Sequence, residues 1–119
     1  VDEVGLFAPT QVIDVSSREC RKLYWTPEDF GIRTASGSKR KDLLVANAAE
    51  SAACIATVLF GELGPARDVV LLNAAAVLWA AGSAASLPEA RVLAEQAIDT
   101  GKAKQKLHDL VKFSQQAER

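Results

Sequence analysis

Two segments near the start of the chain are rich in β-branched and aromatic residues, as extended strands are. They occupy residues 11–15 and 20–26, and the polar run at 16–19 between them suits a turn. The pattern therefore predicts an antiparallel β-hairpin.

The segment after this hairpin predicts a short helical turn and then a loop. Thr26 suits the N-cap, Pro27 suits the first helical position, and the two acids that follow suit the positive end of a helix dipole. Gly31 ends the helix after about one turn. Residues 33–42 are polar and carry a run of basic side chains, so we expect an exposed loop there.

From residue 47 onward, capping signals and apolar spacing predict helices. Asn47 suits the N-cap of the first helix, with Glu50 at the reciprocal position of a capping box. Gly61 and the Gly64–Pro65 step end that helix. A second helix is expected from about residue 65 to 81, with a glycine as its stop.

Two further helices follow by the same signals. Ser86 begins a capping box that opens the third helix, which ends near Gly101. Its apolar positions keep to one face and are Ala90, Leu93, Ala94 and Ala97. The fourth helix has lysines on most sides, so it is predicted to lie on the surface. Its apolar side consists of Ala103, Leu107, Leu110 and Val111.

The second helix differs from the others because it has almost no polar face between residues 69 and 79. Such a helix needs cover on every side. Its three neighbours in this chain are one source of cover, and a part of the protein outside this sequence is another. The surface around Val70, Val77 and Trp79 is expected to be only partly covered, which favours self-association or contact with another chain.

Composition narrows the class of protein. The chain has 119 residues, 49% hydrophobic and 24% charged, with a net charge of −1. This suits a single folded domain, an α+β piece with strands and a loop at 1–44 and helices at 45–119. Charge near zero argues against nucleic-acid binding. The stretch 69–87 is interrupted by Asn73 and Gly82, so it predicts a buried helix and no membrane span. Two cysteines without metal-ligand spacing suit a reducing compartment, and we expect a cytoplasmic protein.

Candidate chemistry is sparse. His108 lies alone on the lysine-rich last helix and is expected to be an ordinary surface residue. Cys20 and Cys54 are expected in a strand and in a helix core, both reduced. The adjacent acids Asp2 and Glu3 offer hard oxygen ligands of the kind that hold Mg²⁺. Two neighbouring acids are also commonplace on a solvated surface, so spacing alone leaves both interpretations open.

Three stretches together resemble the anthranilate phosphoribosyltransferase family. They are Asp2 and Glu3 followed by Ala-Pro-Thr-Gln-Val at 8–12, Thr-Pro-Glu-Asp-Phe-Gly at 26–31, and the segment 61–75 with its Arg-Asp-Val-Val-Leu-Leu-Asn-Ala-Ala core. The resemblance covers essentially the whole chain and corresponds to the C-terminal part of the family's α/β domain. The family usually has glycine where this chain has Ala8.

The resemblance implies a function and a cofactor. Members of the family transfer the phosphoribosyl group from phosphoribosyl pyrophosphate to anthranilate in tryptophan biosynthesis, and release pyrophosphate. Asp2 and Glu3 match the family's pair of Mg²⁺ ligands. The resemblance also implies a homodimer for the complete enzyme. The family's Gly-Thr-Gly-Gly-Asp loop and its anthranilate-binding residues have no counterpart here, so the isolated chain is expected to be inactive.

Two other interpretations stay open at this point. One is a non-catalytic helical interaction module that docks on a partner chain through its apolar second helix. The other is a paralogue of the same fold that resembles the nucleoside phosphorylases or binds nucleic acid. The stretch at 26–31 favours anthranilate transfer over phosphorolysis, by resemblance.

Overall fold

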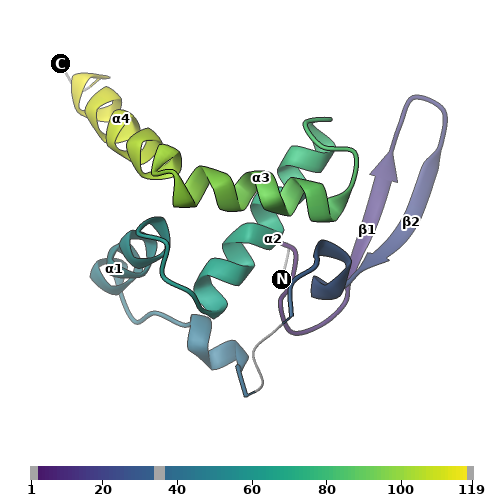
Figure 1. The fold of residues 1–119 in the computed structure, drawn as a ribbon, viewed down its shortest axis with the longest axis horizontal. Helices are drawn as coiled ribbons and strands as arrows, with labels where there is room; N and C mark the ends of the chain where they lie inside the picture. Colours follow the sequence, from purple (N-terminus) through teal and green to yellow (C-terminus); the bar gives the residue numbers. More distant parts are fainter. Residues whose placement is uncertain (1–2, 34–36, 118–119) are drawn as a thin grey trace.

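A computed structural model describes residues 3–33 and 37–117 of the chain. In these ranges a β-hairpin is followed by two short 3₁₀ helices and four α-helices (Figure 1). The elements are β1 (Thr10–Val15), β2 (Cys20–Trp25), η1 (Pro27–Phe30), η2 (Arg40–Leu43), α1 (Ala48–Leu59), α2 (Pro65–Ala80), α3 (Leu87–Asp99) and α4 (Lys102–Ala117). The predicted α+β order, a hairpin and then helices, is confirmed.

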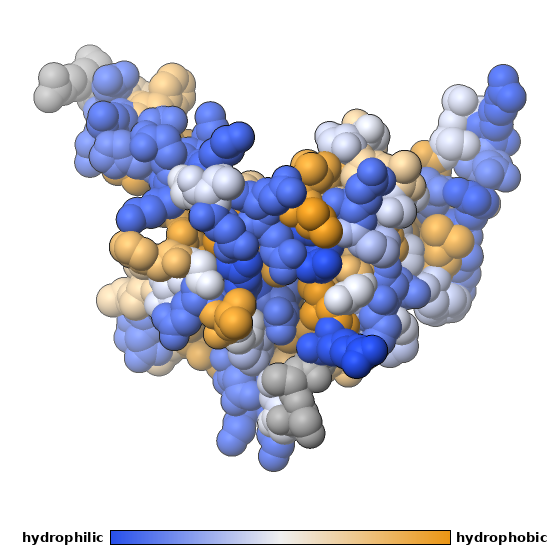
Figure 2. Space-filling model, viewed as in Figure 1, coloured by the Kyte–Doolittle hydropathy of each residue, from blue (hydrophilic) through white to orange (hydrophobic). Residues whose placement is uncertain are grey.

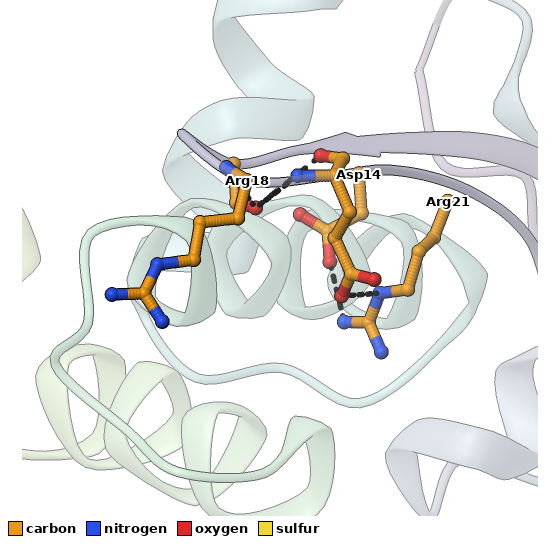
Figure 3. A network of polar contacts seen from close by, with 5 residues as sticks. Asp14, Arg18 and Arg21 are labelled. Atoms are coloured by element: carbon orange, nitrogen blue, oxygen red, sulfur yellow. Dashed lines mark hydrogen bonds and ion pairs between the residues drawn. The ribbon is translucent and has the colours of Figure 1, made fainter.

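The predicted antiparallel hairpin is confirmed, and the structure adds its register. Val12 lies opposite Leu23, and Asp14 lies opposite Arg21. The turn is closed by the Ser16 backbone N–H, which donates to the Glu19 carbonyl at 2.9 Å. Across the strands, the Arg21 guanidinium and the Asp14 carboxylate point toward one another at 2.8 Å, whereas the Arg18 side chain points away from this pair (Figure 3). This ion pair is exposed to solvent, so it fixes register more than it adds stability.

Aromatic contacts attach the base of the hairpin to the helices. The ring of Trp25 packs edge-to-face against Phe30 at 5.5 Å and against Trp79 at 5.3 Å between centroids. Phe30 is fully buried. Beyond Trp25 the hairpin projects away from the helices (Figure 1). Trp25 therefore links the hairpin, η1 and the end of α2.

The core lies where α2 and α3 pack against each other beneath η1 and the N-terminal segment. Small side chains on α3 allow the two helices to approach closely. The buried apolar residues are Val4, Leu6, Phe30, Ile32, Val58, Leu71, Leu72, Ala75, Ala90, Ala94 and Ile98. On the apolar face of α3, Ala90 and Ala94 are buried and Ile98 continues their one-turn spacing, whereas Leu93 is 37% exposed.

The helix ends follow the capping signals. The Asn47 Oδ1 accepts the Glu50 backbone N–H at 2.9 Å, and the Ser86 Oγ accepts that of Glu89 at 3.3 Å. Each glutamate accepts the N–H of the residue before the cap, from Ala46 and Ala85 respectively. Both predicted helix starts are therefore confirmed.

The loop predicted at 33–42 is partly wrong. Residues 40–43 form η2, whose first turn is stabilised by the Asp42 carboxylate accepting the Lys39 backbone N–H at 2.7 Å. In the sequence, Asp42 follows three basic residues, which together are typical of an exposed charged loop. The capping role of Asp42 is therefore not apparent from the pattern. Residues 34–36 of the expected loop lie outside the described residues.

Several apolar side chains lack cover in the described part of the chain. Val77 on α2 is 67% exposed and Leu110 on α4 is 60% exposed, whereas Trp79 is half-buried against Trp25 of the hairpin. Hydrophobic surface also lies over α1 in Figure 2. The expected partial cover of the second helix is confirmed at Val70 and Val77. No helix of the described ranges is long and apolar enough to cross a membrane.

Candidate functional site

Glu3 lies at the edge of an open hollow of about 820 Å³. The hollow is formed by the N-terminal segment, by η2 and by the first half of α2, which contribute Arg40, Leu43, Val69 and Asn73 among others. Glu3 itself is exposed. Its predicted partner in metal binding, Asp2, lies outside the described residues. The site is therefore described from Glu3 and from the groups that hold its loop.

The segment after Glu3 is fixed by its own side chains. Val4 and Leu6 are buried, with exposures of 9% and 3%. The Gly5 backbone N–H donates to the Thr10 Oγ1 at 2.9 Å, which closes the loop at the start of β1. Within the described residues only glycines have a positive φ, so Ala8 fits this loop in an ordinary backbone conformation. The family's glycine at this position is not required by the geometry.

The amide of Asn73 connects this loop to α2. Its Oδ1 accepts the Val4 backbone N–H at 2.9 Å, and its Nδ2 donates to the Val4 carbonyl at 3.0 Å. The second N–H of Nδ2 donates to the Val69 carbonyl one turn earlier in α2, at 2.9 Å. In the sequence Asn73 interrupts an apolar stretch and belongs to a motif, and neither feature predicts its contact with Val4. A lone amide inside an apolar helix was the available signal.

A buried cation lies at the start of the same helix. Arg67 is 4% exposed and its Nη2 pairs with the Asp99 Oδ1 at 2.8 Å. The Arg67 Nη1 is buried and has no hydrogen-bond partner in the described ranges. Beside it, burial raises the pKa of the Asp68 carboxyl; the Arg67 charge opposes this shift and the Glu95 charge adds to it. These groups lie at the ends of α2 and α3 and are not among the residues that line the hollow.

The other candidate residues do not gather into a site. His108 is exposed on α4, as predicted, and Cys20 is exposed on β2. Cys54 is half-buried on α1, so its expected place in a helix core is wrong because α1 packs on few neighbours. In residues 3–33 and 37–117, no three His, Cys, Asp or Glu side chains lie close enough to share a metal ion.

The hairpin, the helices and the loop of Glu3 belong to a known class of transferase domain. Residues 1–104 match the family described as "Glycosyl transferase family, a/b domain", and the chain belongs to this family.

Three curated proteins are similar to nearly the whole of this chain. The chain is 43% identical over 114 residues, 96% of its length, to the anthranilate phosphoribosyltransferase of Thioalkalivibrio sulfidiphilus, of which it covers 33%. It is 41% identical to the protein of the same name from Herminiimonas arsenicoxydans, over 98% of this chain and 33% of that protein. For Acetivibrio thermocellus the identity is 40%, over 96% of this chain and 32% of that protein. The chain thus spans about a third of the length of the curated relatives it matches.

Proposed function

We propose that this chain is part of an anthranilate phosphoribosyltransferase, which transfers the phosphoribosyl group from phosphoribosyl pyrophosphate to anthranilate and releases pyrophosphate. The observation that carries the proposal is the identity of 40–43% to enzymes of that name over nearly the whole chain. The exposed carboxylate of Glu3 at an open hollow supports it. The chain would supply the C-terminal third, and the pyrophosphate loop and anthranilate-binding residues would come from the rest of the enzyme.

We assign Mg²⁺ as the cofactor, held by Asp2 and Glu3. The donor chemistry fits, because Mg²⁺ usually takes one or two carboxylates and completes its octahedral shell with substrate phosphates and water. Glu3 offers such an exposed carboxylate beside the hollow. When bound, Mg²⁺ neutralises the charge that develops on departing pyrophosphate.

The chain's own contribution to the reaction is to hold this carboxylate in place. Val4 and Leu6 bury their side chains on either side of Gly5, and Asn73 fixes the backbone of Val4. Glu3 is therefore exposed directly beside an anchored segment. A carboxylate that is fixed before substrate arrives needs no reorganisation during the reaction. The isolated chain would be inactive, and the complete enzyme would be a homodimer, as the resemblance implies. The low cysteine count favours a cytoplasmic location for it.

The test is the doubly neutralised variant Asp2→Asn/Glu3→Gln in the complete enzyme. Loss of the charged contacts should lower turnover by about a hundredfold, and raising Mg²⁺ should restore part of it. Calorimetric titration with Mg²⁺ in the presence of pyrophosphate should show weaker binding. The matched control is Glu62→Gln, which neutralises an exposed acid in the turn after α1. Full activity of the double variant would remove these carboxylates from the mechanism.

A further inference from the structure

The contact between Asn73 and Val4 has the geometry of two paired peptide groups. A carboxamide carries a donor and an acceptor side by side, as a backbone residue in a β-bridge does. Asn73 uses both on a single residue, accepting from the Val4 N–H at 2.9 Å and donating to the Val4 carbonyl at 3.0 Å. The N-terminal segment is thus bound to the side of α2 by two hydrogen bonds between its backbone and one side-chain amide. Only asparagine and glutamine carry such an amide.

The orientation of this amide is determined by its third contact. The remaining N–H of Nδ2 donates to the Val69 carbonyl within α2 at 2.9 Å. If the amide were turned by 180°, its oxygen would face two carbonyl oxygens and its NH₂ group would face the Val4 N–H. The hydrogen-bond network therefore permits one orientation of the Asn73 amide. The rigid helix thereby sets the position of Val4.

The position of the Val4 backbone in turn fixes the part of the hollow next to Glu3. Glu3 precedes Val4 directly, and both Glu3 and Asn73 line the same hollow. The Val4 side chain is buried whereas Glu3 is exposed, so the segment cannot rotate about its axis without exposing Val4 and burying the carboxylate. The side-chain amide and the buried valine together fix which way Glu3 faces.

We infer that Asn73 is a positioning residue for the Glu3 carboxylate, acting through the backbone of Val4. The inference rests on the proposed function, since it assigns a purpose to the Glu3 carboxylate. Groups that orient metal ligands from behind usually change metal affinity by about 10- to 100-fold when they are lost. Because Asn73 holds the residue beside the ligand and not the ligand itself, we expect an effect of about tenfold.

The experiment compares two substitutions at position 73 in the 119-residue chain. Asn73→Leu has a similar size and makes no hydrogen bond. Asn73→Asp keeps the acceptor for the Val4 N–H but sets a carboxylate against the two carbonyl oxygens, of Val4 and Val69. The matched control is Asn47→Ala, which removes the chain's other asparagine and the cap of α1 without contact to Val4.

Two measurements separate positioning from general stability. Amide hydrogen exchange at Val4 and Gly5, compared with exchange at Leu72 in the core, reports whether the loop stays bound. Line broadening of the same amides by Mn²⁺, an octahedral ion that prefers oxygen ligands, reports metal binding at Glu3. Glu3→Gln shows how much of the broadening depends on that carboxylate.

The expected result is loss of exchange protection at Val4 in Asn73→Leu while Leu72 stays protected. The Mn²⁺ concentration needed for equal broadening should rise about tenfold in Asn73→Leu, rise at least as much in Asn73→Asp because of the repulsion from the two carbonyl oxygens, and stay at the parent value in Asn47→Ala. Protection at Val4 that survives Asn73→Leu would overturn the inference, as would global loss of protection at Leu72 in both variants.

Two outcomes distinguish this inference from the proposed function. If exchange at Val4 increases while Mn²⁺ broadening stays at the parent level, Glu3 is placed without help from Asn73; the positioning role is then wrong and the metal assignment stands. If the parent chain shows no Mn²⁺ broadening that Glu3→Gln removes, the metal assignment fails and the positioning role fails with it.

Discussion

The buried guanidinium of Arg67 pairs with the carboxylate of Asp99, which is 56% exposed, at 2.8 Å. The pair joins the first turn of α2 to the last residue of α3, the two helices that build the core. Arg67 is 4% exposed, so its charge needs the Asp99 carboxylate beside it. Leaving a buried charge unpaired lowers stability by more than the intact ion pair adds to it.

Removal of the acid should therefore destabilise the chain. Asp99→Ala is expected to lower the free energy of unfolding by about 2 kcal/mol, since the exposed side of the pair limits the loss. Adding Arg67→Met should recover part of this, because an apolar side chain of similar length replaces the unpaired cation. Urea denaturation of the two single variants and the double variant measures the coupling. Strict additivity of the two changes would contradict this account.

Asp68 gives a pH dependence whose sign follows from its environment. Burial raises the pKa of this carboxyl above the ordinary value of 3.8, so the folded state binds the proton more tightly than the unfolded state. The stability of the parent then falls as pH rises from 3.8 through the raised pKa. Asp68→Asn lacks this titration, so its Tm relative to the parent should increase over that window and level off above it. Thermal melts at several pH values, with the exposed Asp109→Asn as control, would show a flat difference if the assignment is wrong.

Trp25 is expected to carry most of the attachment of the hairpin. Trp25→Ala removes the edge-to-face contacts with Phe30 and Trp79 and should cost about 3 kcal/mol. Tyr24→Ala on the same strand is the matched control, because Tyr24 is 60% exposed and should matter little. Denaturant titrations compare the two. Equal losses of unfolding free energy in the two variants would mean that strand pairing, and not the aromatic contact, attaches the hairpin to the helices.

The uncovered apolar side chains predict self-association of the isolated chain. Val77 on α2 and Leu110 on α4 are exposed at 67% and 60%, and contiguous apolar surface favours contact between molecules. Val77→Lys and Leu110→Lys should each reduce the sedimentation coefficient at high protein concentration while the helical content stays unchanged. A monomeric parent without dye-accessible apolar surface would refute this expectation.

The sequence predicted most of the local structure because local structure here depends on local signals. The caps Asn47 and Ser86 act within three residues, and the glycines after α1, α2 and α3 have positive φ angles of 88°, 74° and 77° that favour glycine. Hairpin pairing likewise joins residues at most 15 positions apart, Thr10 and Trp25. Such features are determined before any tertiary contact forms.

Features that depend on distant residues were not predictable in the same way. Nothing near Val4 indicates that its backbone will meet Asn73, which is 69 residues away. Similarly, the pairing of Arg67 with Asp99 could not be told from ordinary surface charges until α2 and α3 were placed together. The acids Asp2 and Glu3 were named through resemblance and stay a prediction, whereas the contact of Asn73 with Val4, the residue after Glu3, could not be told from the sequence.

The hydrogen bonds between Asn73 and Val4 also determine the order in which the chain can fold. Closing a loop of 69 residues carries a large entropic cost, which is recovered only once α2 is helical and presents the amide at a fixed point. During synthesis the segment around Glu3 leaves the ribosome before residue 73 exists, so it must remain unattached until α2 has emerged and folded. The segment before β1 thus reaches these native contacts only after α2 has formed.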